Sequence, residues 1–176
     1  MIYKITGFKD IDGQKLMALY RESNRENTDY FYPELTDKEE ALKKAEQEYL
    51  RYIKNDFLSA GSNEYWILEE NGVWVCALRL YKIRDTLYYI EALETHPDFR
   101  KMGYAKQLLS GVIEALKKRG PFRLCDCVDK KNPASLKTHE SCGFAVVSDA
   151  GYDYLSNEAS DQDYGMQYAY PGERLG

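Results

Sequence analysis

The chain has 176 residues, enough for one domain with a sizeable core, and we expect a single domain over residues 1–176. Hydrophobic residues make up 44% of it and charged residues 30%, which excludes a disordered chain. The net charge of −5 argues against nucleic acid as a partner and accommodates a cationic or amine substrate. No apolar run reaches membrane-spanning length and no signal peptide follows Met1, so we expect a cytoplasmic protein without a membrane partner.

The first half of the chain predicts a strand, two helices and a hairpin. In chain order these are a strand at residues 2–6, a helix from about residue 16, a very polar segment at 21–27, an aromatic loop at 30–33, a helix that opens with a capping box at 36–39 and runs to about 53, and strands at 65–68 and 73–80. Asn71-Gly72, between the last two, is the strongest short hairpin signal.

The stretch from Leu87 to Arg119 predicts a strand, a basic turn and a helix. The strand ends near Pro97, because proline lacks an amide donor. From about Gly103 an apolar stripe recurs at helical spacing, and Gly120 ends the helix. The stripe consists of Leu108, Leu109, Val112, Ile113 and Leu116.

The start of this helix is a candidate anion site. First-turn amide groups have no partner within the helix and can bind phosphate. Gly103 lets the backbone approach an oxyanion closely, and Arg100, Lys101 and Lys106 add positive charge. An ordinary strand-to-helix connection with solvated basic residues is the alternative interpretation.

The second half continues with short elements. They are a strand at residues 122–128, a helix capped by Asn132 and Pro133 that runs to about Cys142, a strand at 144–147, an acidic segment rich in tyrosine at 151–163 that could be a long hairpin loop, and a strand at 164–170. Cys125, Cys127 and Cys142 with His139 could be read as a zinc set. The usual spacing of two to four residues within a knuckle is missing, so we expect no metal.

Two blocks of sequence resemble a known family. Residues 100–105, Arg-Lys-Met-Gly-Tyr-Ala, resemble the R/Q-x-x-G-x-G/A signature of the GCN5-related N-acetyltransferase superfamily, whose loop holds the pyrophosphate of acetyl-coenzyme A. Asn132-Pro133-Ala134-Ser135, His139-Glu140 and Gly143-Phe144 resemble that family's N-x-x-S…Y-E-x-x-G-F segment. The two blocks come in the family's order, with a strand pattern between them.

The resemblance implies an α/β fold, the acyl-CoA N-acyltransferase fold: a mixed, mostly antiparallel sheet of six to seven strands flanked by about four helices. It also implies acetyl-coenzyme A as cosubstrate, with no metal. The contacts would come from the strand end, the loop and the second block, namely Leu93, Glu94, Thr95, Arg100, Lys101, Met102, Gly103, Tyr104, Ala105, Lys106, Asn132, Ser135 and His139.

Glu91 is the predicted general base. Several small-molecule members of the family carry a carboxylate four residues before the position of Thr95. Period-two alternation places Tyr89, Glu91, Leu93 and Thr95 on one face, where desolvation should raise the pKa of the glutamate. Glu94 should point to the other face and is the weaker candidate. A glutamate exposed on a wet sheet face is the alternative interpretation of Glu91.

The predicted acid departs from the family pattern. Where the family commonly has tyrosine, this chain has His139, which could donate a proton to the departing thiolate. The alternatives are water as the donor and a surface histidine without a catalytic role.

The resulting prediction is an N-acetyltransferase that acetylates a primary amine of a small molecule or peptide. Tyr30, Phe31 and Tyr32 either shape the acceptor pocket, as the first two helices and their loop do in the family, or pack as a hydrophobic loop. A non-catalytic acyl-CoA sensor on the same fold, or an enzyme using another acyl donor or an aminoacyl carrier, are the rivals. The sequence leaves the identity of the amine and a homodimer open.

Overall fold

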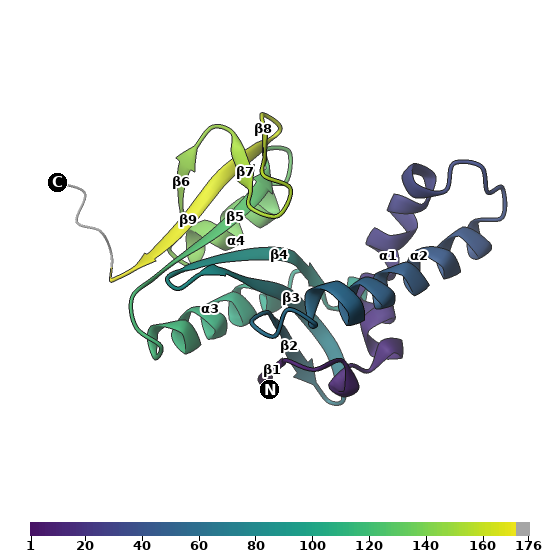
Figure 1. Ribbon diagram of the computed structural model, residues 1–176, viewed down its shortest axis with the longest axis horizontal. Coiled ribbons are helices and arrows are strands. Elements are labelled where there is room, and N and C mark those ends of the chain that lie inside the picture. The colour runs from purple at the N-terminus through teal and green to yellow at the C-terminus, as the bar shows by residue number, and fades with distance from the viewer. Residues whose placement is uncertain (172–176) are drawn as a thin grey trace.

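A computed structural model describes residues 1–171 of the chain. Within these residues, seven strands form one sheet in the order β1-β2-β3-β4-β5-β9-β6, and only the β4–β5 pair is parallel (Figure 1). The strands of the sheet are β1 Ile2–Ile5, β2 Glu64–Glu70, β3 Val73–Arg84, β4 Leu87–Thr95, β5 Phe122–Asp129, β6 Ala145–Ser148 and β9 Asp163–Tyr170. The predicted mixed, mostly antiparallel sheet is confirmed.

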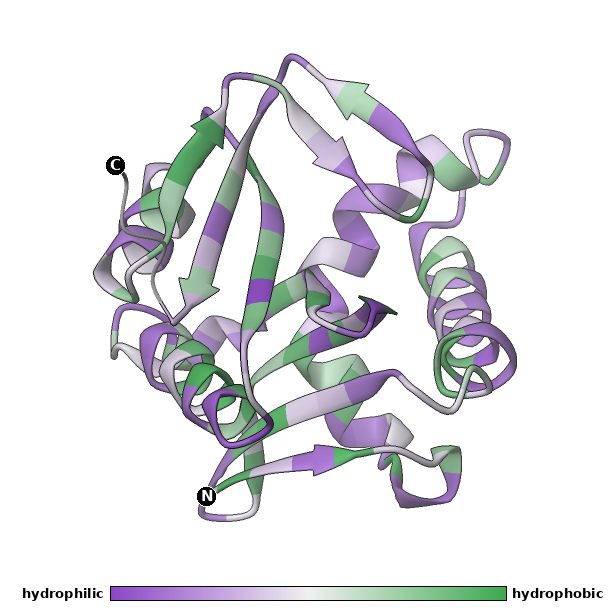
Figure 2. Cartoon of the chain, turned by 60° about the vertical axis from the view of Figure 1, so that its left-hand side comes forward, coloured by the Kyte–Doolittle hydropathy of each residue, from purple (hydrophilic) through white to green (hydrophobic). Residues whose placement is uncertain are grey.

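In the described part of the chain four α-helices flank the sheet, as the sequence predicts. They are α1 Gly13–Phe31, α2 Lys38–Tyr52, α3 Tyr104–Lys117 and α4 Pro133–Ser141. Figure 2 shows α1 and α2 on one side of the sheet and α3 and α4 on the other. No helix in residues 1–171 combines the length and the apolar character needed to cross a membrane.

The sheet separates two hydrophobic cores. On one face, the buried apolar stripe of α3 packs against side chains such as Leu78 and Ile90. On the other face, Leu16 and Leu19 of α1 pack against Tyr65 and neighbouring strand residues. Each fully buried leucine stabilises the fold by about 1.5–3 kcal/mol, so these stripes fix which face each helix covers.

One prediction about the connections is wrong and another needs an addition. The polar segment at residues 21–27 and the first part of the expected aromatic loop belong to α1, which continues to Phe31. This part of α1 packs beside α2, where Arg21 and Arg25 pair with Glu39, and Glu22 pairs with Arg100, so its polar side chains have charged partners (Figure 1). The expected long hairpin loop at 151–163 does connect the antiparallel neighbours β6 and β9, and it also contains a two-stranded hairpin of its own, β7 Gly151–Asp153 and β8 Glu158–Ser160.

The sheet opens between its two parallel strands. β4 and β5 pair only from Leu87 to Tyr89, so the rest of β4 has one edge without a strand neighbour within residues 1–171. Past this point β4 carries a bulge, and Ala92 adopts a left-handed conformation with φ +51°. The hydroxyl of Tyr20 on α1 donates a hydrogen bond of 2.7 Å to the carbonyl oxygen of Ala92. The opening and the bulge together position the candidate site.

Candidate active site

The N-terminus of α3 is the one α-helix start in residues 1–171 without a side-chain cap. Asp12, Asp37 and Asn132 accept hydrogen bonds from the first-turn amides of α1, α2 and α4. At α3 the N-cap is Gly103, with φ +83° and no side chain to accept such a bond. Its first-turn amides therefore remain available to an external oxyanion.

These amides face a cleft of about 460 Å³ between the end of β4, the start of α3 and the start of α4, here named the cofactor cleft. Most of the residues predicted to bind the cofactor lie along it. The lining is Leu93, Thr95, Arg100, Lys101, Gly103, Tyr104, Ala105, Lys106, Asn132, Ala134, Ser135 and Thr138. Two segments about thirty residues apart in sequence thus meet at one cleft.

Three predicted cofactor contacts lie outside this lining. Met102 is 63% exposed, Glu94 lines a different cavity, and His139 is buried. Arg100 does line the cleft, but its guanidinium is engaged by Glu22 at 2.6 Å and Glu94 at 3.1 Å. The positive charge expected at the loop is therefore partly neutralised by these two carboxylates.

His139 is neither a surface residue nor a cleft residue. Its ring is 1% exposed, its Nδ1 lies 2.9 Å from the carbonyl oxygen of Ser135, and its Nε2 lies 2.8 Å from Oδ2 of Asp126 on β5. Burial lowers the pKa of His139, but the hydrogen bond and charge of Asp126 outweigh this effect and raise it. Because both ring nitrogens have partners, one on α4 and one on β5, His139 links α4 to β5. Its role as proton donor stays a prediction, and its burial argues against that role.

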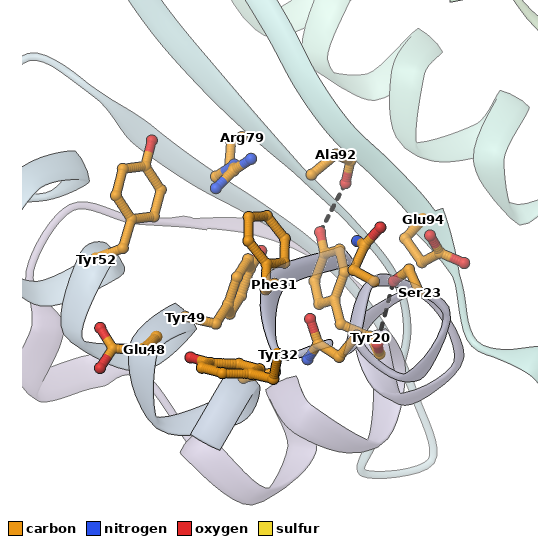
Figure 3. Close-up of a pocket in the computed structure, with 13 residues that line it drawn as sticks. Tyr20, Ser23, Phe31, Tyr32, Glu48, Tyr49, Tyr52, Arg79, Ala92 and Glu94 are labelled. Atoms are coloured by element: carbon orange, nitrogen blue, oxygen red, sulfur yellow. Dashed lines mark hydrogen bonds between the residues drawn. The ribbon is translucent and has the colours of Figure 1, made fainter. Parts of the chain in front are cut away.

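A second cavity of about 610 Å³ lies between α1, α2 and the sheet, here named the acceptor cavity (Figure 3). Its lining is largely aromatic and amide-bearing: Tyr20, Ser23, Asn24, Asn27, Phe31, Tyr32, Ala45, Glu48, Tyr49, Tyr52, Arg79, Ala92 and Glu94. Of the predicted aromatic residues, Phe31 and Tyr32 line it, whereas Tyr30 is 82% exposed and does not.

The bulge at Ala92 corrects the predicted faces of β4. Ala92 and Glu94 line the acceptor cavity, whereas Leu93 and Thr95 line the cofactor cleft on the opposite face. Glu91 lies directly opposite Arg79 of β3 in the strand register, and Arg79 lines the acceptor cavity. Glu91 therefore lies on the same face of the sheet as Glu94. The expectation that Glu91 shares a face with Leu93 and Thr95 is wrong, because the bulge adds a residue and shifts the alternation by one position.

The two carboxylates have different surroundings. Glu91 does not lie among apolar groups as expected: its Oε2 is 2.8 Å from Nη2 of Arg79 and accepts a hydrogen bond of 3.1 Å from the Tyr81 hydroxyl. Burial raises the pKa of Glu94, and the facing Arg100 only partly opposes this. Glu94 therefore has the environment that the sequence predicted for Glu91.

Sequence reasoning missed Tyr20 and Arg79. Tyr20 is 3% exposed, and burial raises its pKa well above the ordinary value, so its hydroxyl stays a donor to Ala92. Arg79 stood out in the sequence only as one charge within an apolar strand, residues 73–80. That charge was the available signal, because a buried arginine requires partners.

Comparison with known proteins identifies the family. A family model described as the Acetyltransferase (GNAT) family matches residues 16–144. This range includes the residues of α1, β4 and α4 that line the two cavities. The chain belongs to this family. No curated protein matches it by sequence.

Solved GNAT structures share the fold at low identity. The PaiA N-acetyltransferase from Thermoplasma acidophilum, crystallised with coenzyme A, has a TM-score of 0.65 at 16% identity, covering 97% of this chain and 99% of that one. A GNAT acetyltransferase from Staphylococcus aureus has a TM-score of 0.63 at 14% identity, with 96% and 99% covered. YncA from Salmonella typhimurium, crystallised with acetyl-CoA, has a TM-score of 0.58 at 17% identity, with 100% and 96% covered.

The cofactor cleft of this GNAT chain gives a matched test. A β-carbon at Gly103 or at Gly72 of the β2–β3 turn would meet no protein atom within 4 Å, and both glycines have positive φ. Gly103→Val and Gly72→Val should therefore lose similar stability, about 1–2 kcal/mol from the left-handed backbone. Only Gly103→Val should weaken coenzyme A binding, by about tenfold or more, in calorimetric titration. Equal affinities in the two folded variants would refute the assignment of the cleft.

The His139–Asp126 pair generates a stability prediction. Because the folded-state pKa of His139 is raised, the pair's contribution is full below the ordinary value of 6.5 and is lost as pH rises through the raised value. His139→Ala should lower the free energy of unfolding by about 3–5 kcal/mol, since it leaves Asp126 buried without its partner.

Urea denaturation of both proteins across a pH series measures these effects. The wild-type midpoint should fall on the alkaline side, and the variant should lack that slope. The outcome that would contradict this prediction is a His139→Ala variant that is as stable as the wild type at every pH but whose pH–rate profile lacks the basic limb. In that case His139 would act as the catalytic acid.

Proposed function

We propose that this GNAT protein transfers the acetyl group of acetyl-coenzyme A to a primary amine of a small molecule or peptide by direct attack. One observation carries the proposal: successive residues of β4 line the two cavities alternately. Leu93 and Thr95 line the cofactor cleft, and Ala92 and Glu94 line the acceptor cavity. A single strand thus separates the two reactants, and it separates them where the sheet opens.

The opening provides the route between the cavities. Beyond Tyr89 the edge of β4 has no strand neighbour within residues 1–171, so its amides and carbonyls can pair with the amide-bearing arm of the cofactor as a neighbouring strand would. The phosphates would lie at Gly103 and the thioester near Ala92. Fixing both reactants at the bulge converts a bimolecular reaction into a reaction within one complex.

Proton transfer requires a base on the acceptor side. The amine nitrogen attacks the thioester carbonyl, the carbon–sulfur bond breaks, the thiolate leaves, and the ammonium proton must be removed. We assign that removal to Glu94, directly or through water, because it lines the acceptor cavity and its pKa is raised. Glu91, the base predicted from the sequence, is engaged by Arg79 and Tyr81 and stays the alternative.

Release of free thiol from acetyl-coenzyme A in the presence of a panel of amines tests the function. The panel should include amino acids, monoamines, polyamines, aminoglycosides and peptides. At least one should accelerate thiol release over hydrolysis. Coenzyme A binding without turnover on any amine would favour the rival function, an acyl-CoA sensor.

A pair of variants tests the base. Glu94→Gln should lower kcat by about 10²–10⁴-fold and remove the acidic limb of the pH–rate profile, which falls as pH drops through the raised pKa of Glu94. Glu91→Gln is the matched control, removing one carboxylate from the same strand, and should keep that limb. If the limb disappears in Glu91→Gln and persists in Glu94→Gln, the sequence prediction is right and our assignment is wrong.

A further inference from the structure

The floor of the acceptor cavity contains a buried cation. Arg79 of β3 lines the cavity, its side chain is 12% exposed, and its guanidinium lies over the rings of Tyr49 and Tyr52 at 5.6 Å and 5.1 Å from their centroids. Burial lowers its pKa, but the neighbouring tyrosines and Glu91 outweigh burial and raise it, so the group stays charged. The cavity is therefore built around a fixed positive charge.

This guanidinium is only partly satisfied. An arginine has five N–H donors. Nη2 of Arg79 donates to Glu91 at 2.8 Å, whereas Nε is buried and has no hydrogen-bond partner within residues 1–171. Buried donors without an acceptor are rare in native proteins, and a ligand carboxylate that reaches this guanidinium would supply the missing acceptor.

We propose that the acetyl acceptor is an amino acid, an amine that carries a carboxylate and an apolar side group, and that Arg79 binds its carboxylate. This inference rests on the proposed N-acetyltransferase function. The planar guanidinium matches a carboxylate in geometry, and bidentate pairs of this kind are strong and specific.

The positions of Arg79 and Glu94 suit the two charges of an amino acid. Figure 3 shows Arg79 and Glu94 on opposite sides of Ala92, with Arg79 toward Tyr52. Strand register agrees, because Arg79 pairs with Glu91 while Glu94 pairs two residues away with Ala77. The ammonium group then lies by Glu94 at the thioester, and the carboxylate lies at Arg79.

The aromatic walls of the cavity accept the apolar side group of the amino acid. Phe31, Tyr32 and Tyr49 line the cavity with aromatic surface. A second ammonium group placed at Arg79 would meet a like charge, so a polycationic amine gains nothing from this residue. A monoamine without a carboxylate would leave the buried Nε unsatisfied.

Matched substrate pairs test the proposal on the wild-type protein. Each amino acid is compared with the amine that lacks its carboxylate: phenylalanine with 2-phenylethylamine, leucine with 3-methylbutylamine, and lysine with 1,5-diaminopentane. Phenylalaninamide, which retains the carbonyl without the charge, and spermidine complete the set. The amino acid of at least one pair should have a kcat/KM about 10- to 100-fold above its decarboxylated partner.

A substituted arginine links that preference to the residue. Arg79→Lys keeps the charge but loses the planar donor fork, so it should lower the ratio of kcat/KM for acid over amine by about tenfold. Arg25→Lys is the control, because Arg25 is on the exposed side of α1 and lines neither cavity. A merely structural role for Arg79 would lower both rates and leave the ratio unchanged.

Inhibition by an acid without an amine gives a readout independent of turnover. 3-Phenylpropionate should compete with the acceptor in the wild type and bind about tenfold more weakly to Arg79→Lys. The proposal would be overturned if the decarboxylated amines, the amide or spermidine were acetylated as well as the amino acids are. That result would leave the proposed acetyl transfer intact. Turnover of no panel member despite coenzyme A binding would also count against it. Failure of coenzyme A to bind would instead refute the proposed function itself.

Discussion

The bulge in β4 is the constraint on which the site depends. Ala92 has φ +51°, a conformation that costs a non-glycine residue about 1–2 kcal/mol. The hydrogen bond from the buried Tyr20 hydroxyl to its carbonyl contributes about 0.5–1.5 kcal/mol and so offsets much of that cost. α1 therefore does more than cover the sheet, since it stabilises the backbone irregularity that brings Glu94 to the acceptor side.

Most elements of this fold could be predicted from the sequence because their signals are local. Asn71-Gly72, Pro97 and Asn132 act through their own backbone preferences, and the structure places the expected turns and helix start there. The left-handed residue in β4 had no such signal, because alanine does not favour that conformation. One extra residue in a strand reverses every later side chain. The prediction therefore placed Glu91 on the face of Leu93 and Thr95, although it correctly placed Glu94 on the opposite face.

Contacts between residues far apart in the sequence are the second feature that could not be predicted from the sequence. His139 could be aligned with a family position, but its contact with Asp126 depends on how α4 packs on β5. The same holds for Arg100, which looked like a phosphate ligand and is also the ion-pair partner of Glu22 and Glu94. A residue type at a motif position indicates what it can bind, whereas its charge partners are fixed only by the folded chain.

Two ion pairs flank the bulge and determine which ligand charges the site accepts. Arg79–Glu91 lies on one side and Arg100–Glu94 on the other, so each carboxylate is balanced before any reactant binds. Two unbalanced carboxylates near one opening would favour a polycation, and two unbalanced arginines would favour a polyanion. Within these pairs two features remain: the buried Nε of Arg79 has no acceptor within residues 1–171, and burial raises the pKa of Glu94 despite Arg100. A ligand with one acidic and one basic group satisfies both.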